Sequence, residues 1–216
     1  MKNHKISLES LALKEYPVLL DTSALIDYYT QNRDPETLTE KFAKAKECYD
    51  FFVLMKNYVQ NGSNFYITSL VSNELQMGYS LPFKKSIKKI GGCKNREILE
   101  LHRKRRDVAK ARRILDRTFQ ENDKILKFGG EEQSWYDILY KRNIELKEKY
   151  KISESDFDLL ISGGALAKTQ RTVALVSNDL GIFRARKDIL NREKLWSGKF
   201  KFFIREDFLD FKKIGR

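Results

Sequence analysis

The sequence has few cysteines and histidines, and this scarcity excludes several classes of protein. Two cysteines and two histidines in 216 residues are too few, and wrongly spaced, for a structural zinc site, so any metal would be held by oxygen atoms. Cys48 and Cys93 do not make a disulfide framework. Nucleotide-cofactor enzymes are also disfavoured, because Gly91-Gly92 and Gly163-Gly164 lack the spacing of a phosphate-binding loop and follow no predicted strand.

Long hydrophobic runs are missing as well. No apolar stretch approaches the roughly 20 residues needed to cross a bilayer. The first residues contain no apolar secretory segment followed by a small-residue cleavage site. We therefore expect a soluble, cytoplasmic protein.

What the sequence has in excess is positive charge. Lys and Arg total 42 against 30 Asp and Glu, which gives a formal net charge of +12. Residues 84–117 hold 14 basic and 4 acidic residues, so this segment alone carries +10 of that total. Such a balance favours a polyanionic partner, and nucleic acid is the first candidate.

Short apolar runs alternate with amphipathic stretches along the chain. Buried strands are predicted at residues 18–20, 65–68, 172–176 and 202–204. Helices are predicted at residues 24–29, 35–58, 70–77, 97–119, 135–139, 155–166 and 180–186. This alternation predicts an α/β protein with a parallel sheet covered on both faces. We expect one domain over residues 1–216, with a basic helical insertion at about residues 80–150.

Acidic residues follow several of these strands. Asp21 comes directly after the first strand, Asp179 follows the central strand by three residues, and Glu74 lies near the start of the next helix. Asp156 and Asp158 lie in the first turn of the helix that leads into the central strand and must run antiparallel to it. All five acids are therefore predicted at the carboxyl edge of the sheet, where parallel α/β proteins bind ligands.

A cluster of carboxylates needs a compensating charge. Like charges raise the cost of ionising one another unless a cation or a helix N-terminus offsets the repulsion. Hard divalent cations such as Mg²⁺ take carboxylate and water oxygens and leave positions for phosphate. One or two such ions would activate water and neutralise a pentavalent phosphate, so the cluster predicts a phosphodiesterase site.

Each acid also has a purely structural interpretation. Asp21 and Asp179 stand where helix N-caps stand, and Asp156 or Asp158 can form a capping box with the serine three residues before it. Glu74 alone would more often be a solvated helix residue. The convergence of all five on one edge favours the chemical interpretation.

Three segments resemble motifs of the PIN-domain family, which includes the toxin nucleases of the VapC type. Residues 18–27 (VLLDTSALID) resemble the opening strand with its acid, residues 67–74 (ITSLVSNE) the second motif, and residues 176–179 (VSND) the fourth. For the third motif, residues 155–165 allow two registers, in which either Asp156 or Asp158 is the helix-start acid.

The resemblance covers about residues 16–77 and 153–203 and implies a PIN-like three-layer α/β/α fold. It also implies a ribonuclease, expected to be an endonuclease, that depends on Mg²⁺ or Mn²⁺. The acids would form the metal site, with Ser23 and Ser177 supporting it. The short toxins lack a basic insertion of this length, so the resemblance does not by itself imply an antitoxin partner. An antitoxin, another protein partner and a homodimer are all left open.

The basic insertion is predicted to lie along RNA phosphates, which would release counterions and make binding strongly salt-dependent. The residues assigned to this contact are Lys84, Lys85, Lys88, Lys89, Arg103, Lys104, Arg105, Arg106, Arg112 and Arg113. The alternatives are a solvated helix face or a docking surface for an acidic protein.

Two other functions fit parts of the pattern. A phosphatase of the haloacid-dehalogenase type also begins with a strand and an aspartate, but it requires a second acid where Ser23 stands. A non-catalytic RNA-binding protein on the same scaffold would explain the charge without chemistry. The acids at all four motif positions argue against that second alternative.

Overall fold

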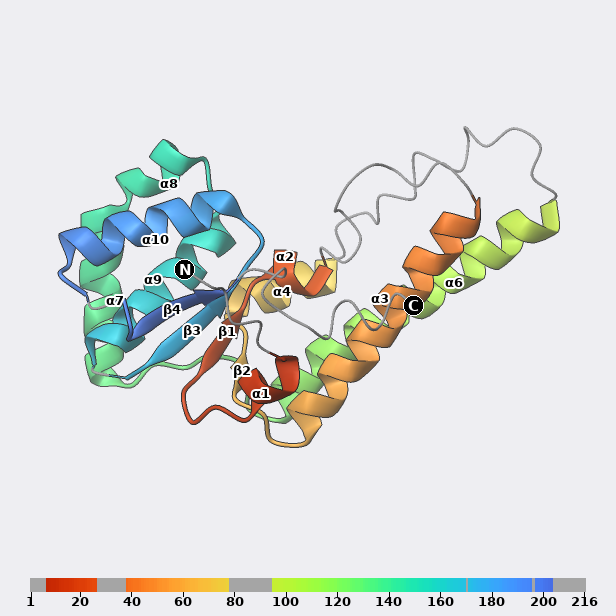
Figure 1. The fold of residues 1–216 in the computed structure, drawn as a ribbon, viewed down its shortest axis with the longest axis horizontal. Coiled ribbons are helices and arrows are strands. Elements are labelled where there is room, and N and C mark those ends of the chain that lie inside the picture. Colours follow the sequence, from red (N-terminus) through yellow and green to blue (C-terminus); the bar gives the residue numbers. More distant parts are fainter. Residues whose placement is uncertain (1–6, 27–37, 78–94, 170, 196, 204–216) are drawn as a thin grey trace.

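The chain forms a parallel sheet flanked by helices (Figure 1). The computed structural model describes residues 7–26, 38–77, 95–169, 171–195 and 197–203. In this part the strands β1 (Val18–Leu20), β2 (Phe65–Tyr66), β3 (Val173–Val176) and β4 (Phe200–Phe203) lie in the order β2-β1-β3-β4, and all pairs are parallel. This confirms the predicted α/β class and the parallel sheet, an arrangement compatible with three layers.

The inner strands β1 and β3 consist of apolar residues that are all buried, as expected for strands covered on both faces. Their register pairs Leu20 with Val176. The residues that follow, Asp21 and Ser177, therefore leave the sheet side by side. The sequence of the two strands thus determines which polar groups meet at the edge.

The strand order reverses direction between these two inner strands. From β1 the chain continues through α2 (Thr22–Ile26) and α3 (Leu38–Gln60) to β2 on one side, whereas from β3 it continues through α10 (Leu180–Arg192) to β4 on the other. Connections that diverge in this way leave a crevice at the carboxyl ends of the two strands. Asp21 and Ser177 lie at this switch point.

Helices α7 (Gly130–Asn143), α8 (Glu145–Tyr150) and α9 (Glu154–Lys168) pack together beside the sheet, and α10 packs against α8 and α9. Nearly every residue of α9 after its first turn is buried. Gly163 allows its close approach to β4, because an added Cβ would lie 2.6 Å from the Phe200 ring. The apolar α9 therefore holds its N-terminal acids in a fixed place at the carboxyl edge.

Helices α3 and α6 (Asn95–Glu121) pack along one another and extend away from the sheet as a two-helix arm (Figure 1). Helix α4 (Ser69–Met77) joins the base of the arm to the site. There the buried Asp116 of α6 accepts hydrogen bonds from Ser72 Oγ at 2.6 Å and Gln76 Nε2 at 3.0 Å. The arm and α4 are thus tied by a buried polar contact.

The helices of the expected insertion at about residues 80–150 pack in two places. Helix α6 belongs to the arm, while α7 packs against α9 and α8 packs against α10. Between them the chain returns beside β2 through a bridge from Ile67 to Ile125. The short helices α1 (Leu8–Ala12) and α8 were not predicted, and the expected helix ends at 27–29 and 35–37 lie outside the described residues.

Among the helices described, none is both long enough and apolar enough to cross a bilayer.

Candidate functional site

Asp21 is the most deeply buried acid at the carboxyl edge, with 1% of its surface exposed. Its backbone N–H donates to Val176 O at 3.0 Å, which continues the β1–β3 ladder. Ser177 Oγ donates to Asp21 Oδ2 at 2.6 Å, and Ser23 Oγ donates a short hydrogen bond to the same oxygen. The structure therefore brings together the acid and the two serines that the resemblance assigned to support it.

The same serines tie the loop after β3 to the first turn of α2. Ser23 Oγ accepts the Asn178 backbone N–H at 3.1 Å, and Ser177 Oγ accepts the Asp179 backbone N–H at 3.0 Å. Because each serine oxygen accepts from a backbone amide, its own hydrogen is left to point at Asp21. This second layer of contacts fixes the orientation of the carboxylate.

The other oxygen of this carboxylate, Asp21 Oδ1, is buried and has no hydrogen-bond partner in the described part of the chain. Burial, and then the negative charge of Asp156, raise the pKa of Asp21 to about 7, against the opposing effect of the Ser177 and Ser23 hydrogen bonds. A desolvated carboxylate of this kind is costly without a counter-charge. Below about pH 7 a proton on Asp21 removes this cost, and a bound cation would offset it above that pH.

Glu74 links three elements at the same edge. Thr22 Oγ1 of α2 donates to Glu74 Oε2, and Ser155 Oγ of α9 donates to Oε1, both through short hydrogen bonds. Sequence reasoning did not identify Thr22 and considered Ser155 only as a helix cap. The available signal was their position, because each hydroxyl directly adjoins an acid of the cluster, Asp21 or Asp156.

Asp156 and Asp158 point to different surroundings, since two residues along a helix turn the side chain by about 200°. Asp156 forms a capping box at the start of α9, with Ser153 Oγ donating to its Oδ2 at 2.7 Å, and its charge acts on Asp21. Asp158 accepts from the Tyr136 hydroxyl of α7 at 2.7 Å, and burial raises the pKa of its carboxyl. Of the two acids, Asp156 is the one whose charge raises the pKa of Asp21.

Asp179 is the N-cap of α10, as its structural interpretation predicted. Its Oδ1 accepts the Ile182 backbone N–H at 3.2 Å and also the Gly181 N–H. Across the residues that the structure describes, no group of three or more Asp, Glu, His or Cys side chains is gathered closely enough to hold a metal ion. The acids are held singly by hydroxyls and amides, while Asp156 and Asp21 interact electrostatically.

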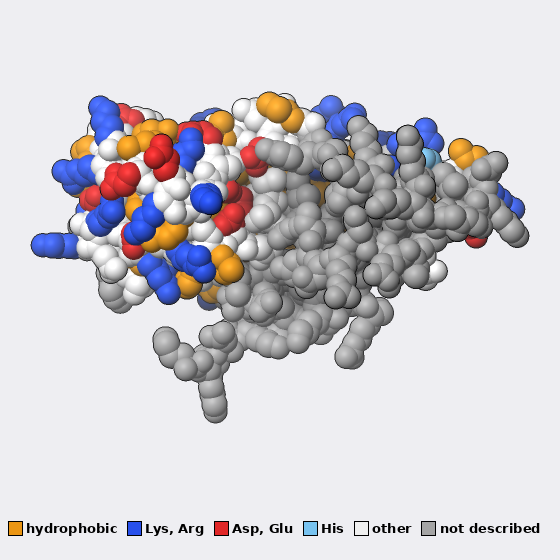
Figure 2. Space-filling view, turned by 90° about the horizontal axis from the view of Figure 1, so that it is seen from above, with side chains coloured by type: hydrophobic (Ala, Val, Ile, Leu, Met, Phe, Trp, Pro, Cys, Tyr) orange, Lys and Arg blue, Asp and Glu red, His pale blue; other side chains and the backbone are white. Residues whose placement is uncertain are grey.

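Basic side chains gather on the arm. Figure 2 shows Lys and Arg beside the histidine at the arm end of the molecule, whereas basic and acidic side chains are interleaved over the α/β body. The exposed members of the predicted RNA-contacting set on α6 are Arg103, Lys104, Arg106 and Arg113. The remaining lysines of that set lie outside the described residues, at positions Lys84, Lys85, Lys88 and Lys89.

Two arginines of the predicted set do not lie on the exposed face of α6. Arg112 is only 7% exposed. Arg105 is half-buried, and burial lowers the pKa of its guanidinium. An α-helix that packs against a partner must turn some of its residues inward, and α6 turns these two toward the rest of the arm. They are therefore poor candidates for direct contact with phosphates.

The carboxyl edge as a whole combines a desolvated carboxylate, a second acid that acts on it, and hydroxyl donors from α2, from the first turn of α9 and from the loop after β3. Oxygen groups of this kind suit a hard divalent cation, of which Mg²⁺ is commonly held by one or two carboxylates. Protein-family models, curated proteins and solved structures gave no match to the chain.

Proposed function

We propose that this chain is a metal-dependent ribonuclease of the PIN type, which cleaves RNA internally at the carboxyl edge of its sheet. The observation that carries the proposal is the Asp21 carboxylate. It is buried at the switch point, one of its oxygens lacks a partner among the described residues, and Asp156 raises its pKa further. A buried carboxylate of this kind costs stability, and acids that are kept at such a cost are found preferentially at functional sites.

Asp21 and Asp156 would hold the ion, which is Mg²⁺ or Mn²⁺. Two carboxylates are sufficient for Mg²⁺, because its other positions go to water and to substrate phosphate. When bound, the ion supplies an activated water and neutralises charge on the phosphate. The protein's own contribution is orientation, since Ser23 and Ser177 fix Asp21.

Glu74 and Asp179 complete the acidic edge in this proposal. Thr22 and Ser155 orient the Glu74 carboxylate, and Asp179 is fixed as the cap of α10. These residues shape the negative potential around the proposed ion. Asp158, which bonds to Tyr136, is assigned a structural role instead.

RNA is the proposed substrate because the acidic edge is joined to a strongly basic arm. Residues 84–117 carry +10 of the net charge of +12, and seven Lys and Arg side chains of α6 are exposed. Cations in such a stripe bind phosphates with little regard to sequence and release counterions. The arm would thus supply affinity, while the edge supplies the reaction.

The proposal is tested by following cleavage of labelled single-stranded and structured RNA in Mn²⁺, Mg²⁺ or chelator. Wild-type protein is expected to cleave only with metal, and Asp21→Asn to lose cleavage while still unfolding cooperatively. Asp137→Asn is the matched control, because Asp137 is exposed on α7 and bonds to Gln133 at 2.9 Å. Full activity in Asp21→Asn would refute the site.

The alternative is a non-catalytic RNA-binding protein on the same scaffold, which the basic arm alone would explain. An RNA-binding assay on the same samples distinguishes the two. Tight RNA binding with no cleavage in any metal would favour the alternative, whereas metal-dependent cleavage lost in Asp21→Asn would exclude it.

A further inference from the structure

The two-helix arm carries a groove whose surface is not explained by contacts with phosphate. It lies between α3 and α6 and has a volume of about 680 Å³. Three of its apolar side chains are partly open to solvent, with Tyr49 43% exposed, Val53 36% exposed and Ile114 39% exposed. They stand beside buried neighbours such as Phe52 and Val108, so they form one continuous apolar strip.

The spacing of the lining residues shows how the groove runs. On α3 they recur every three or four positions from Ala45 to Lys56, and on α6 they do so from Lys104 to Ile114. Each helix therefore contributes one face, and the groove runs parallel to both axes. Eleven residues of helix span about 16 Å, which matches about three turns of a third helix laid between them.

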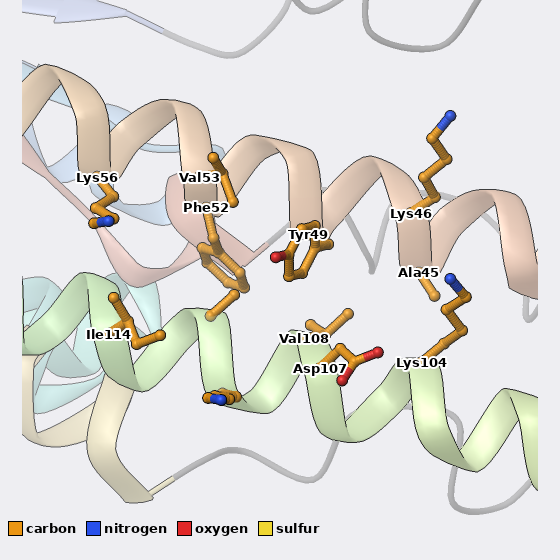
Figure 3. Close-up of a pocket in the computed structure, with 12 residues that line it drawn as sticks. Ala45, Lys46, Tyr49, Phe52, Val53, Lys56, Lys104, Asp107, Val108 and Ile114 are labelled. Carbon is orange, nitrogen blue, oxygen red and sulfur yellow. The ribbon is translucent and has the colours of Figure 1, made fainter.

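The rim of the groove is basic. Lys46 and Lys56 of α3 and Lys104 and Lys110 of α6 line it, against a single acid among the described lining residues, Asp107. Figure 3 shows Lys46 and Lys104 at one end of the groove and Lys56 toward the other, with Tyr49, Val53 and Val108 between them. The groove thus has positive ends and a largely apolar middle, beside which one acid, Asp107, lies.

We infer that this groove binds an amphipathic helix of a partner protein, which presents about three turns of apolar side chains flanked by Asp or Glu. The apolar middle requires a partner that buries Val53 and Ile114, and the lysines require negative charge beside it. This surface is separate from the proposed nuclease site, so the inference does not depend on that function.

Two other occupants fit the groove less well. Single-stranded RNA needs aromatic or guanidinium faces on which bases stack, yet the exposed part of the described lining offers one aromatic ring, Tyr49, beside the aliphatic Val53 and Ile114. A second copy of this chain would bring its own lysine rim to the interface. Like charges facing one another would oppose that contact.

The inference is tested by selecting from a displayed library of helical peptides on the full chain, in chelator. The apolar positions of the peptides repeat at helical spacing, and the flanking positions vary among Glu, Lys and Ser. We expect Glu to be enriched at the flanks, and the selected peptides to bind in a salt-sensitive manner. Selection of Lys-flanked or neutral peptides, or no selection at all, would overturn the inference.

Variants then locate the binding site. Ile114→Asp and Val53→Asp should each weaken the selected peptide by about tenfold or more, because a buried charge at the centre of an interface is costly. Ile138→Asp on α7 is the matched control, since Ile138 is 38% exposed and does not line the groove. Equal affinity in all three variants would place the peptide elsewhere and refute the groove.

A charge swap and an RNA control complete the test. Lys46→Glu with Lys104→Glu should shift the selected flanks from Glu to Lys, whereas Lys141→Glu on α7 should leave the selection unchanged. The same variants are also tested for binding of an RNA oligonucleotide. If Ile114→Asp lowers the affinity for RNA but not for the peptide, the groove binds RNA and the inference is contradicted. These binding measurements are made in chelator, where the proposed nuclease is inactive. A failure of the nuclease proposal therefore cannot be mistaken for a failure of peptide binding.

Discussion

The acidic edge of the sheet and the basic arm use charge in opposite ways. At the edge, Asp21 is 1% exposed, and its neighbours Ser23 and Ser177 fix its orientation. On the arm, Arg103, Lys104 and their exposed neighbours point into solvent. Exposed charges cost little and attract an anion of any shape, whereas a buried charge is expensive and holds one geometry. In the proposed function, the edge would supply the chemistry and the arm would supply the affinity.

The largest expected effect separates two acids of the edge. Asp156→Asn should lower RNA cleavage by about a hundredfold or more, because the charge beside Asp21 would be lost. Asp158→Asn should change cleavage little, since Asp158 faces Tyr136. Steady-state cleavage rates of the two variants, each checked for cooperative unfolding, measure the contrast. If Asp158→Asn were the more damaging change, the assignment of the third acid would be wrong.

The next effect concerns stability and pH. The pKa of Asp21 is raised from 3.8 to about 7, so the folded state binds this proton more tightly than the unfolded state. The contribution of Asp21 to stability is therefore highest below 3.8 and falls as pH rises toward 7. In chelator, the free energy of unfolding of wild type should therefore fall by a few kcal/mol relative to that of Asp21→Asn as pH rises over this range. The size of the fall follows from the size of the pKa shift.

Denaturant unfolding of both proteins across this pH range gives the difference curve. A difference that does not change with pH would show that Asp21 titrates in the folded state as it does in the unfolded chain. The comparison with Asp21→Asn is needed because other carboxyls of the chain titrate in the same range.

The arm should control affinity without affecting the reaction. Replacing Arg103, Lys104 and Arg106 by Gln should weaken RNA binding by about tenfold and flatten its salt dependence, while cleavage at saturating RNA is retained. The matched control replaces three exposed lysines outside the arm, Lys127, Lys141 and Lys194. Binding measured over a series of salt concentrations decides the outcome, and equal slopes in both triple variants would remove the arm from RNA binding.

The smallest effect tests the hydroxyls around Glu74. Thr22→Val removes the donor to Glu74 Oε2 and should lower cleavage severalfold, corresponding to about 1 kcal/mol for a lost hydrogen bond. Thr169→Val is the control, because its hydroxyl donates to Leu166 O at the C-terminal end of α9, whereas Asp156 lies in the first turn of that helix. Cleavage rates that fall equally in the two variants would indicate a general loss of stability rather than a role for Thr22.

The fold class and the edge were predictable because they depend on local patterns. Apolar runs such as 18–20 and 173–176 admit little besides buried strands, and a parallel sheet brings the residues that follow them together. The direction in which a side chain points from a helix was harder to predict from the sequence. Asp156 and Asp158 could not be separated, because the rotation of α9 is set by its packing against the sheet and α7.

Non-local packing also explains what the sequence did not reveal about the arm. The pairing of α3 with α6 turns Arg112 inward, although its neighbours in sequence are basic and exposed. Likewise, residues 130–150 continue the helical pattern of the insertion but pack against α9 and α10. The donors to Glu74 come from residues 22 and 155, and only the folded chain brings them together.

The central claim is that the buried carboxylate at the sheet edge binds a divalent cation. Calorimetric titration of Mn²⁺ into wild type, Asp21→Asn and Asp137→Asn near neutral pH, without RNA, tests it most directly. We predict that wild type and Asp137→Asn bind Mn²⁺ alike and that Asp21→Asn binds it at least about tenfold more weakly. Equal Mn²⁺ affinity in wild type and Asp21→Asn would contradict the account.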